Sequence, residues 1–365
     1  MRFPTTIQAL SAAAALVLLA GCSGGSALAP KMPSSTQSHV HMVNGRSTSV
    51  LNPMGLLKIG HVARAGYHGA SFNTCPATGI LVYVSDAADN TVNIFAGNLA
   101  GQSPCGILTG FLEPQGLAVH DDNLYVANTV GDPSGAAGNI EAFKRGATTP
   151  FMTYTDPSNS GNYPTGVAVS NDNVVLAANI ISNAATGSLS TFNKHSGAVI
   201  NNYLNADGTE TFFVTIQKDG TTYYDGFSAG FASAVMSQGS CIHGVCGTFT
   251  DTAAALLFPG GIRSSNNENV DLDDQSGSGG GTVSSYTSPN FTSPVGVCTE
   301  GAIDPVTIDI NHTQHHLFYA DAGQGQAFEM NHYNPGAGSG CALMGSVFTS
   351  GGSPIGVAVD TPSSN

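Results

Sequence analysis

The sequence predicts an all-β protein, on three observations. Only 34 of the 365 residues are charged (10 Lys and Arg, 24 Asp and Glu), whereas 41% are apolar and 46 are Gly. Disordered chains combine few apolar residues with much charge, and helix bundles need abundant Glu, Lys, Arg, Ala and Leu, so both classes are excluded. Short runs rich in Val, Thr, Tyr and Phe alternate with Gly, Asn and Ser, which is typical of strands and turns. The third observation is that these runs repeat.

The repeat is a short strand that ends in Asp or Asn. It occurs six times, and the terminal polar residues follow one another at intervals of 42, 51, 46, 49 and 47 residues. These residues are Asp86, Asn128, Asn179, Asp225, Asp274 and Asp321. The nearly constant spacing indicates one structural unit that recurs along the chain.

Each of these strands has similar neighbours. About fifteen residues upstream an apolar run begins, and in most units it opens with Pro. These runs are residues 114–119, 164–169, 212–216 (without Pro), 259–262 and 305–308. A second β run follows downstream, for example residues 92–95 and 140–143. A four-stranded unit of this length is the mark of a β-propeller, so we predict one six-bladed propeller over residues 51–365.

The motif of these units is Pro-x-Gly-[Leu/Val]-Ala-Val, then Tyr-Val-[Ser/Ala]-[Asp/Asn], then a hairpin. It resembles the NHL, YVTN and SMP-30/gluconolactonase-like six-bladed propellers over residues 55–360. The resemblance is clear in blades one to three and six, and weak in blades four and five. It implies the fold more than any activity. The acidic metal ligands of the lactonase-like enzymes do not map onto this chain residue by residue, so none is transferred.

The two ends of the repeat predict how the ring closes. Residues 354–360 have the pattern of a first strand with no blade after it, whereas the unit near Cys75 lacks a first strand. Their pairing would complete a composite blade and remove the open edges. Two ambiguities are a seventh blade within residues 44–67 and a second first-strand pattern at residues 294–297.

Residues 1–21 have the pattern of an export signal. Arg2 precedes an apolar run over residues 9–20, which is too short to span a bilayer. The run ends in Leu-Ala-Gly-Cys at Cys22, which resembles the lipobox of bacterial lipoproteins. The resemblance implies cleavage before Cys22, acylation of that residue and anchoring in the cell envelope, at the periplasmic side of the outer membrane or the cell surface. An ordinary cleavage site with an incidental Cys is the alternative.

Residues 22–50 are predicted to be a flexible tether, because they are rich in Ser, Gly, Pro, Thr and Ala without apolar periodicity. His39 and His41 could form a metal site there. With no Cys or carboxylate near in sequence, a solvated tether is favoured.

Six cysteines remain after Cys22, and an even number in an exported chain predicts disulfides. They could pair in 15 ways. The simplest set joins sequence neighbours: Cys75 with Cys105, Cys241 with Cys246, and Cys298 with Cys341. A zinc site or free buried thiols are the alternatives.

The six strand-end residues are the candidate ligand site. Equivalent positions in a propeller lie at equivalent heights around the channel, so these four carboxylates and two amides would form a ring at the channel mouth. Oxygen ligands suit a hard cation such as Ca²⁺. The alternative is that each side chain binds the backbone of the following turn.

Two other motifs have a structural explanation. Residues 226–230 match Gly-x-Ser-x-Gly around Ser228, but no helix pattern follows, as a nucleophile elbow would require. His312, His315 and His316 lie between two strands of the sixth unit, where an exposed hairpin tip is favoured over a metal site.

The formal charge of −14 argues against nucleic acid as a partner. The sequence therefore predicts a monomeric, lipid-anchored, extracytoplasmic propeller that binds a protein or small molecule and has no evident catalytic motif. A metal-dependent hydrolase or lyase of the SMP-30/gluconolactonase-like kind, using the ring at the channel mouth, is the alternative. A purely structural envelope component is a third possibility.

Overall fold

The structure is a computed structural model of the chain. It describes residues 74–131, 137–156, 162–180, 186–204, 210–228, 233–265, 269–275, 281–298, 305–311, 313, 315–332 and 341–360, together with the backbone of two N-terminal strands. The chain divides into two units, Met1–Lys31 and Met32–Asn365, and all described residues belong to the second. The signal segment, Cys22 and His312 lie outside the described residues. Within the described part of the chain, no helix is long and apolar enough to cross a membrane.

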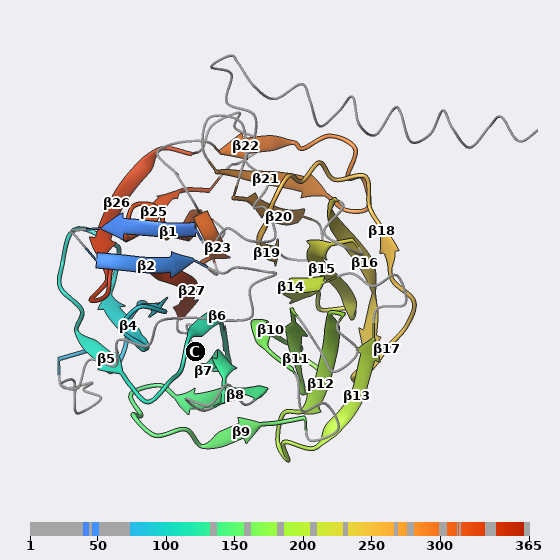
Figure 1. The fold of residues 1–365 in the computed structure, drawn as a ribbon, viewed down its shortest axis with the longest axis horizontal. Coiled ribbons are helices and arrows are strands. Elements are labelled where there is room, and N and C mark those ends of the chain that lie inside the picture. Colours follow the sequence, from blue (N-terminus) through green and yellow to red (C-terminus); the bar gives the residue numbers. More distant parts are fainter. Residues whose placement is uncertain are drawn as a thin grey trace, which may run out of the picture. The chain divides into compact units, whose positions relative to one another are not determined.

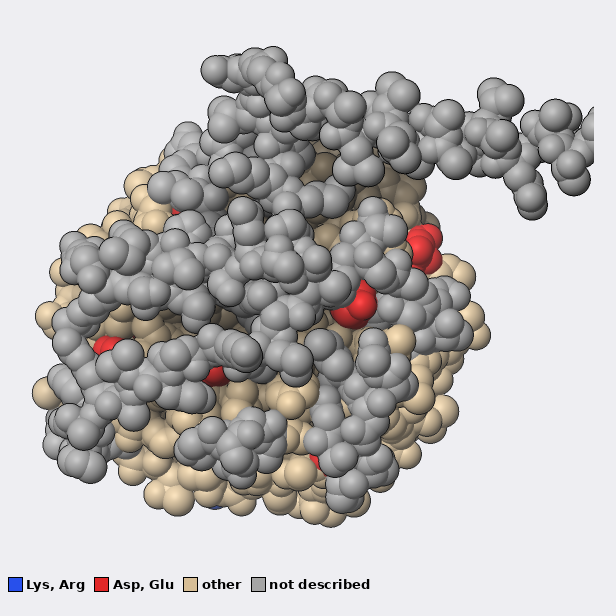
Figure 2. Space-filling view, in the orientation of Figure 1, with Lys and Arg blue, Asp and Glu red and all other residues tan. Residues whose placement is uncertain are grey.

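The described residues form a six-bladed β-propeller without helices, as predicted (Figure 1). Each blade is an antiparallel sheet of four strands, except for a fifth short strand in blade four. The composite blade that contains the C-terminal strand is blade one, and the others follow in chain order. On the face seen in Figure 2, most of the described surface is uncharged, with scattered Asp and Glu side chains.

The strands of blades one to six, from the channel outward, have the following bounds. The inner strands are β27 (Pro354–Asp360), β6 (Pro114–His120), β10 (Pro164–Val169), β14 (Glu210–Ile216), β19 (Pro259–Ser265) and β23 (Pro305–Ile310). The second strands are β3 (Leu81–Asp86), β7 (Asn123–Val130), β11 (Val174–Asn179), β15 (Thr221–Phe227), β20 (Asn269–Asp274) and β24 (His316–Asp321). The third strands are β4 (Thr91–Ala96), β8 (Ala137–Lys144), β12 (Ser188–Asn193), β16 (Ala234–Ile242), β21 (Thr282–Thr287) and β25 (Gln326–Asn331). The outer strands are β5 (Gly106–Leu108), β9 (Met152–Tyr154), β13 (Val199–Leu204), β17 (Val245–Cys246) with β18 (Thr250–Asp251), β22 (Gly296–Cys298) and β26 (Leu343–Phe348).

Two further strands, β1 (His39–Val43) and β2 (Arg46–Val50), pair with each other as an antiparallel hairpin. They lie within the segment that the sequence predicted to be a tether.

The ring closes through the C-terminal strand, as predicted. β27 pairs with β3, with Pro354 opposite Asp86 and Asp360 opposite Leu81. Each inner strand contacts the next, and β27 contacts β6, so the ring is complete with six blades and the seven-blade alternative is wrong. The second first-strand pattern, at residues 294–297, overlaps β22, the outer strand of blade five.

Arg145 reinforces this closure from blade two. Its guanidinium forms an ion pair with Asp360 at the end of β27. It also donates to Ala77 O at 3.2 Å and Gly79 O at 2.6 Å, in the segment that precedes β3. The Arg145 guanidinium therefore binds both the end of β27 and the segment before β3. The Asp360 carboxylate beside it is almost fully buried.

The Gly of the Pro-x-Gly motif allows the inner strands to crowd around the axis. A Cβ on Gly116 would lie 2.6 Å from Thr165 O in the next inner strand. A Cβ on Gly166 would lie 2.8 Å from Phe213 Cα in the blade after that. Both distances are shorter than an ordinary van der Waals contact. This position therefore needs Gly because the next inner strand lies so close, and not because of its own backbone conformation.

The apolar core is divided among the contacts between neighbouring blades. Between blades two and three, Ala118 and Val167 meet near the axis, and Tyr125, Tyr154 and Phe192 pack farther out. Blades spread apart with distance from the channel, so larger side chains fill the wider outer gap.

The three disulfides have the predicted pairing, and the zinc and free-thiol alternatives are wrong. They are Cys75–Cys105, Cys241–Cys246 and Cys298–Cys341. The third joins β22 of blade five to the chain that leads into β26 of blade six. The second closes the β16–β17 hairpin, which also contacts blade three, where Thr191 Oγ1 donates to Gly244 O at 2.6 Å.

Candidate functional site

The face at which each inner strand begins, here called the proline face, holds the residues of the predicted ring. In five blades the Pro that opens the inner strand is paired with an Asp or Asn at the end of the second strand or, for Asn128, two residues before it. These five residues are Asp86, Asn128, Asn179, Asp274 and Asp321. They share one register position and therefore one height along the channel.

Asp225 lies one residue earlier in the register than the other five. In blade four Thr211 pairs with Gly226, just as Pro259 pairs with Asp274 in blade five. Successive side chains of a strand point to opposite faces of the sheet, so Asp225 points to the other side of its blade. The spacing of the strand ends could not reveal this shift, because blade four lacks the Pro that marks the register elsewhere.

The ring carboxylates bind backbone N–H groups. Asp86 Oδ1 accepts from Ala88 N at 3.0 Å, and its Oδ2 accepts from Gly351 N at 2.8 Å. Both oxygens of Asp274 accept N–H groups from the loop that leads into its blade, at 2.9 and 3.0 Å. These side chains therefore fix the turns and loops of the proline face. Among the described residues, no three His, Cys, Asp or Glu side chains come together as a metal site, and the Ca²⁺ ring stays a prediction.

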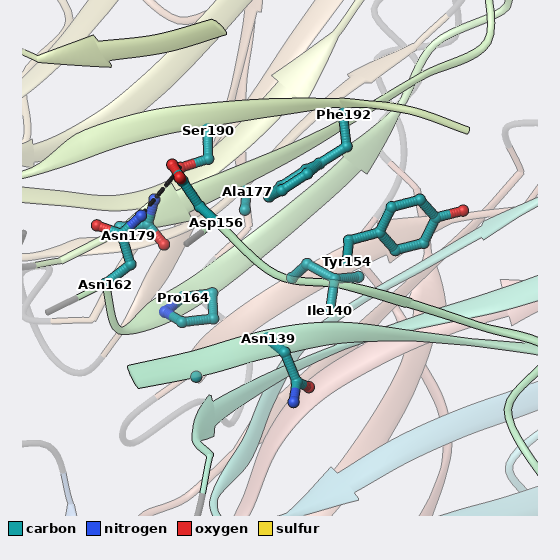
Figure 3. A pocket seen from close by; sticks show the side chains of 11 residues that line it. Asn139, Ile140, Tyr154, Asp156, Asn162, Pro164, Ala177, Asn179, Ser190 and Phe192 are labelled. Atoms are coloured by element: carbon teal, nitrogen blue, oxygen red, sulfur yellow. Dashed lines mark hydrogen bonds between the residues drawn. The ribbon is translucent and has the colours of Figure 1, made fainter. Parts of the chain in front are cut away.

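A recess lies between blades two and three on the proline face (Figure 3). The space within it is about 10 Å³, which is room for one water molecule at most. Its apolar wall is formed by Ile140, Tyr154, Pro164, Ala177 and Phe192, and its polar lining by Gly138, Asn139, Asp156, Asn162, Asn179 and Ser190.

Hydrogen bonds order the polar end of the recess. Asn162 and Asn179 both donate to Ser190 Oγ, at 3.1 and 3.0 Å. Ser190 Oγ donates in turn to Asp156 Oδ2 at 3.2 Å, and Asn202 Nδ2 donates to the same oxygen at 2.7 Å. Figure 3 shows Asp156, Asn162, Asn179 and Ser190 close together at this end. The amide nitrogens are thus used within the network, and one predicted ring residue, Asn179, belongs to it.

The amide oxygens at this site are left without partners. Within the described part of the chain, Oδ1 of Asn139, Asn162 and Asn202 is buried and accepts no hydrogen bond. Leaving a buried acceptor unsatisfied costs about 1–3 kcal/mol. Because the asparagines are distant in sequence, no sequence motif indicated this site.

Two buried glutamates on the proline face were also missed by the sequence analysis. Glu113 directly precedes Pro114 in blade two, and Glu210 precedes Thr211 at the equivalent place in blade four. Burial raises the pKa of each to about 7. Each also has a buried Oε2 without a partner among the described residues. Glu113 has a φ of +58°, and its N–H donates to Asn90 Oδ1 at 2.8 Å.

The Gly-x-Ser-x-Gly and histidine motifs lie only partly within the described residues. Ser228 directly follows β15, with its Oγ 3.0 Å from Ser233 Oγ just before β16, and residues 229–232 lie outside the described part. His315 is exposed, whereas His316 Nδ1 lies 2.6 Å from Glu329 Oε1. The two histidines therefore have different surroundings.

These features define a six-bladed β-propeller with a polar recess between two blades. No family model and no curated protein matches the sequence. A chain from a crystal structure of a nidogen/laminin complex is similar, with a TM-score of 0.55 and 13% identity over 77% of this chain and 98% of that one. TolB from Acinetobacter baumannii has a TM-score of 0.53 and 12% identity, covering 77% of this chain and 66% of TolB. A protein from Lactobacillus plantarum has a TM-score of 0.51 and 14% identity, covering 77% and 99%. At these identities the likeness shows the fold alone.

Proposed function

We propose that this protein is an extracytoplasmic binding module, anchored to the membrane through an acylated Cys22, that recognises a protein partner with the proline face of its propeller. The disulfides are typical of oxidising compartments outside the cytoplasm. The lipobox-like sequence at Cys22 supports the anchor. The similar chain from the nidogen/laminin structure comes from a complex, so a propeller of this shape has a precedent in protein association.

The recess between blades two and three is the observation that carries the proposal. Strands of blades two and three hold most of its lining, and Thr191 of blade three is hydrogen-bonded to the disulfide-closed hairpin of blade four. A rigid site loses little conformational entropy when a partner binds.

The anchor is tested with Cys22→Ala. The unsubstituted protein should incorporate a radiolabelled fatty acid in its host and sediment with membranes. The variant should do neither, whereas Cys75→Ala, which removes a disulfide cysteine, should keep the label. Equal labelling of Cys22→Ala and the unsubstituted protein would refute acylation at this residue.

Partner binding is tested by affinity capture from the host's envelope with immobilised Cys22→Ala protein. Asn139→Arg, which places a long side chain at the recess, should abolish capture of a specific protein. Thr149→Arg adds the same charge in an exposed loop beyond β8 and should leave capture unchanged. If capture is insensitive to Asn139→Arg, and the protein instead hydrolyses lactones or esters with a divalent ion, the enzyme alternative replaces this proposal.

A further inference from the structure

The face opposite the proline face, here called the entry face, is where the chain that follows Cys22 joins the ring. Inner and third strands end at this face, so the segment before β3 and the connection from β4 to β5 both lie on it. Cys75 of that segment forms a disulfide with Cys105 of that connection, and Thr74 Oγ1 donates to Cys105 O at 2.6 Å. Arg145 also binds two carbonyls of the segment. An acyl group on Cys22 would therefore be joined to the ring at this face.

Exposed apolar side chains gather at the entry face. Most of the large apolar side chains that are exposed in the described part of the chain lie beside its turns. They include Val199, Ile200, Ile242, Val245, Leu343 and Met344. At the proline face the corresponding side chains are Leu204, Leu257 and Phe348. Exposed apolar side chains that gather on one side of a protein indicate a surface that binds a membrane or another molecule.

The β16–β17 hairpin holds part of this apolar surface in a fixed shape. Ile242 and Val245 are 52% and 60% exposed on either side of its tip. A disulfide closes the hairpin directly behind them. Ile200 of blade three lies against the tip, where a Cβ on Gly244 would come within 2.6 Å of Ile200 Cδ1. The apolar surface therefore continues from blade four to blade three, and little ordering is needed before it binds.

The basic side chains lie on the same side of the ring. The Lys and Arg side chains that the structure describes are all in turns of the entry face or in the strand halves next to it, and these are Lys144, Arg145, Lys194, Lys218 and Arg263. Asp121, Asp309 and Asp360 form ion pairs with three of them, so this face is close to neutral. The proline face carries carboxylates such as Asp86 and Asp274 with no Lys or Arg among its described residues. Anionic lipid headgroups would therefore repel the proline face more than the entry face.

We propose that the entry face lies against the lipid bilayer, with its exposed apolar side chains in the interface between headgroups and acyl chains. The inference rests on the proposed anchoring through Cys22 and gives the anchored propeller an orientation. A lipid on the chain that joins the ring at this face keeps the face at a high effective concentration near the bilayer. Apolar side chains then bind the interface in proportion to the area that they bury. The proline face points away from the membrane, where a partner can reach it.

The test uses Trp fluorescence, because the chain contains no Trp and one introduced Trp reports only its own position. Acylated proteins with Val245→Trp, Met344→Trp or Leu257→Trp are reconstituted into vesicles of phosphatidylethanolamine and phosphatidylglycerol, with or without bromine on the acyl chains. Side chains that enter the interface by about 5–10 Å come close to the bromine atoms, which quench Trp. The Val245→Trp and Met344→Trp signals should therefore fall by about half in brominated vesicles. Leu257→Trp, at the proline face, should keep its signal.

Paired substitutions identify the side chains responsible. Ile242→Asp combined with Val245→Asp places two carboxylates at the hairpin tip, and should reduce the quenching of Met344→Trp by about half or more. Leu257→Asp combined with Phe348→Asp is the matched control, because these side chains are 48% and 68% exposed and the added charge is the same. The control pair should leave the quenching unchanged. Equal effects of the two pairs would show a response to net charge alone and overturn the assignment.

Flotation of the same vesicles separates this inference from the proposed function. Protein that floats with the vesicles without quenching at Val245→Trp and Met344→Trp would keep the anchor and overturn the orientation. Equal quenching of all three reporters would show no preferred face and would also overturn it. Protein that does not float would refute the anchor and this inference with it. Loss of partner capture in the Ile242→Asp and Val245→Asp pair, without quenching of Val245→Trp, would show a protein-binding face and overturn the lipid assignment.

Discussion

Glu113 offers a direct test of the buried charge on the proline face. The residue is 3% exposed, burial raises its pKa from the ordinary 4.5 to about 7, and its left-handed backbone is fixed by Asn90. One pH unit between the folded and unfolded pKa values is worth about 1.4 kcal/mol. The ionised form therefore costs the folded protein about 3 kcal/mol, as an upper estimate.

The sign of the pH dependence follows from proton binding. Between pH 4.5 and about 7 the folded protein keeps a proton on Glu113 that the unfolded chain has lost. The free energy of unfolding therefore falls as the pH rises through this window, and the full cost is present above it. Glu210, whose pKa is also raised to about 7 by burial, adds a loss of the same sign.

Glu113→Gln removes this titration with little change in shape. The variant should match the unsubstituted protein near pH 4, where Glu113 is protonated, and exceed its stability by about 1–3 kcal/mol near pH 8. Urea unfolding followed by circular dichroism, with disulfides intact, measures the difference across the range. Thr149→Asn is the control, since Thr149 is exposed and carries no titratable group, and it should leave the pH dependence unchanged. A Glu113→Gln variant that follows the unsubstituted protein at every pH would show that this carboxyl is solvated.

Two other substitutions test the closed ring of blades. Arg145→Met leaves the carboxylate of Asp360 buried without its cation, and should lower the free energy of unfolding by about 3–5 kcal/mol in the same assay; an effect below about 1 kcal/mol would show that the closure does not depend on this pair. Gly356→Ala places a methyl group against the neighbouring inner strand and should cost about 3 kcal/mol or more, whereas Gly247→Ala, whose Cβ would lie 3.6 Å from its nearest neighbour, should cost little. Equal thermal stability of the two Gly variants would contradict the crowding of the inner strands.

The fold could be predicted from sequence because each blade repeats the same short-range chemistry. The Pro that opens an inner strand and the Asp or Asn that ends the next one lie only about fifteen residues apart, and the sheet pairs them directly. The closure was visible for a related reason, since residues 354–360 have the first-strand pattern that the unit near Cys75 lacks. Local sequence patterns of this kind can be recognised without any knowledge of tertiary contacts.

The site could not be predicted because it depends on contacts between blades. The polar end of the recess joins Asp156, Asn162, Asn179, Ser190 and Asn202, which come from two blades and form no motif. The strand-end ring shows the converse case, in which a regular sequence pattern does not reveal what the side chains bind. Its spacing is regular, but most of the carboxylate oxygens described here bind backbone N–H groups, because turns and loops at the ends of strands need such acceptors.

The unsatisfied polar groups are unevenly distributed among the blades. Among the described residues, most of the buried side-chain atoms without a hydrogen-bond partner belong to blades two, three and four, and they include Glu113, Asn139, Asn162 and Glu210. Such groups lower stability, and native proteins generally satisfy them. These unsatisfied groups therefore lower the free energy of unfolding of the free protein through blades two, three and four. Substitutions that remove such groups, such as Glu113→Gln, should therefore stabilise the free protein, and partner capture by the same variants tests whether these groups also serve binding.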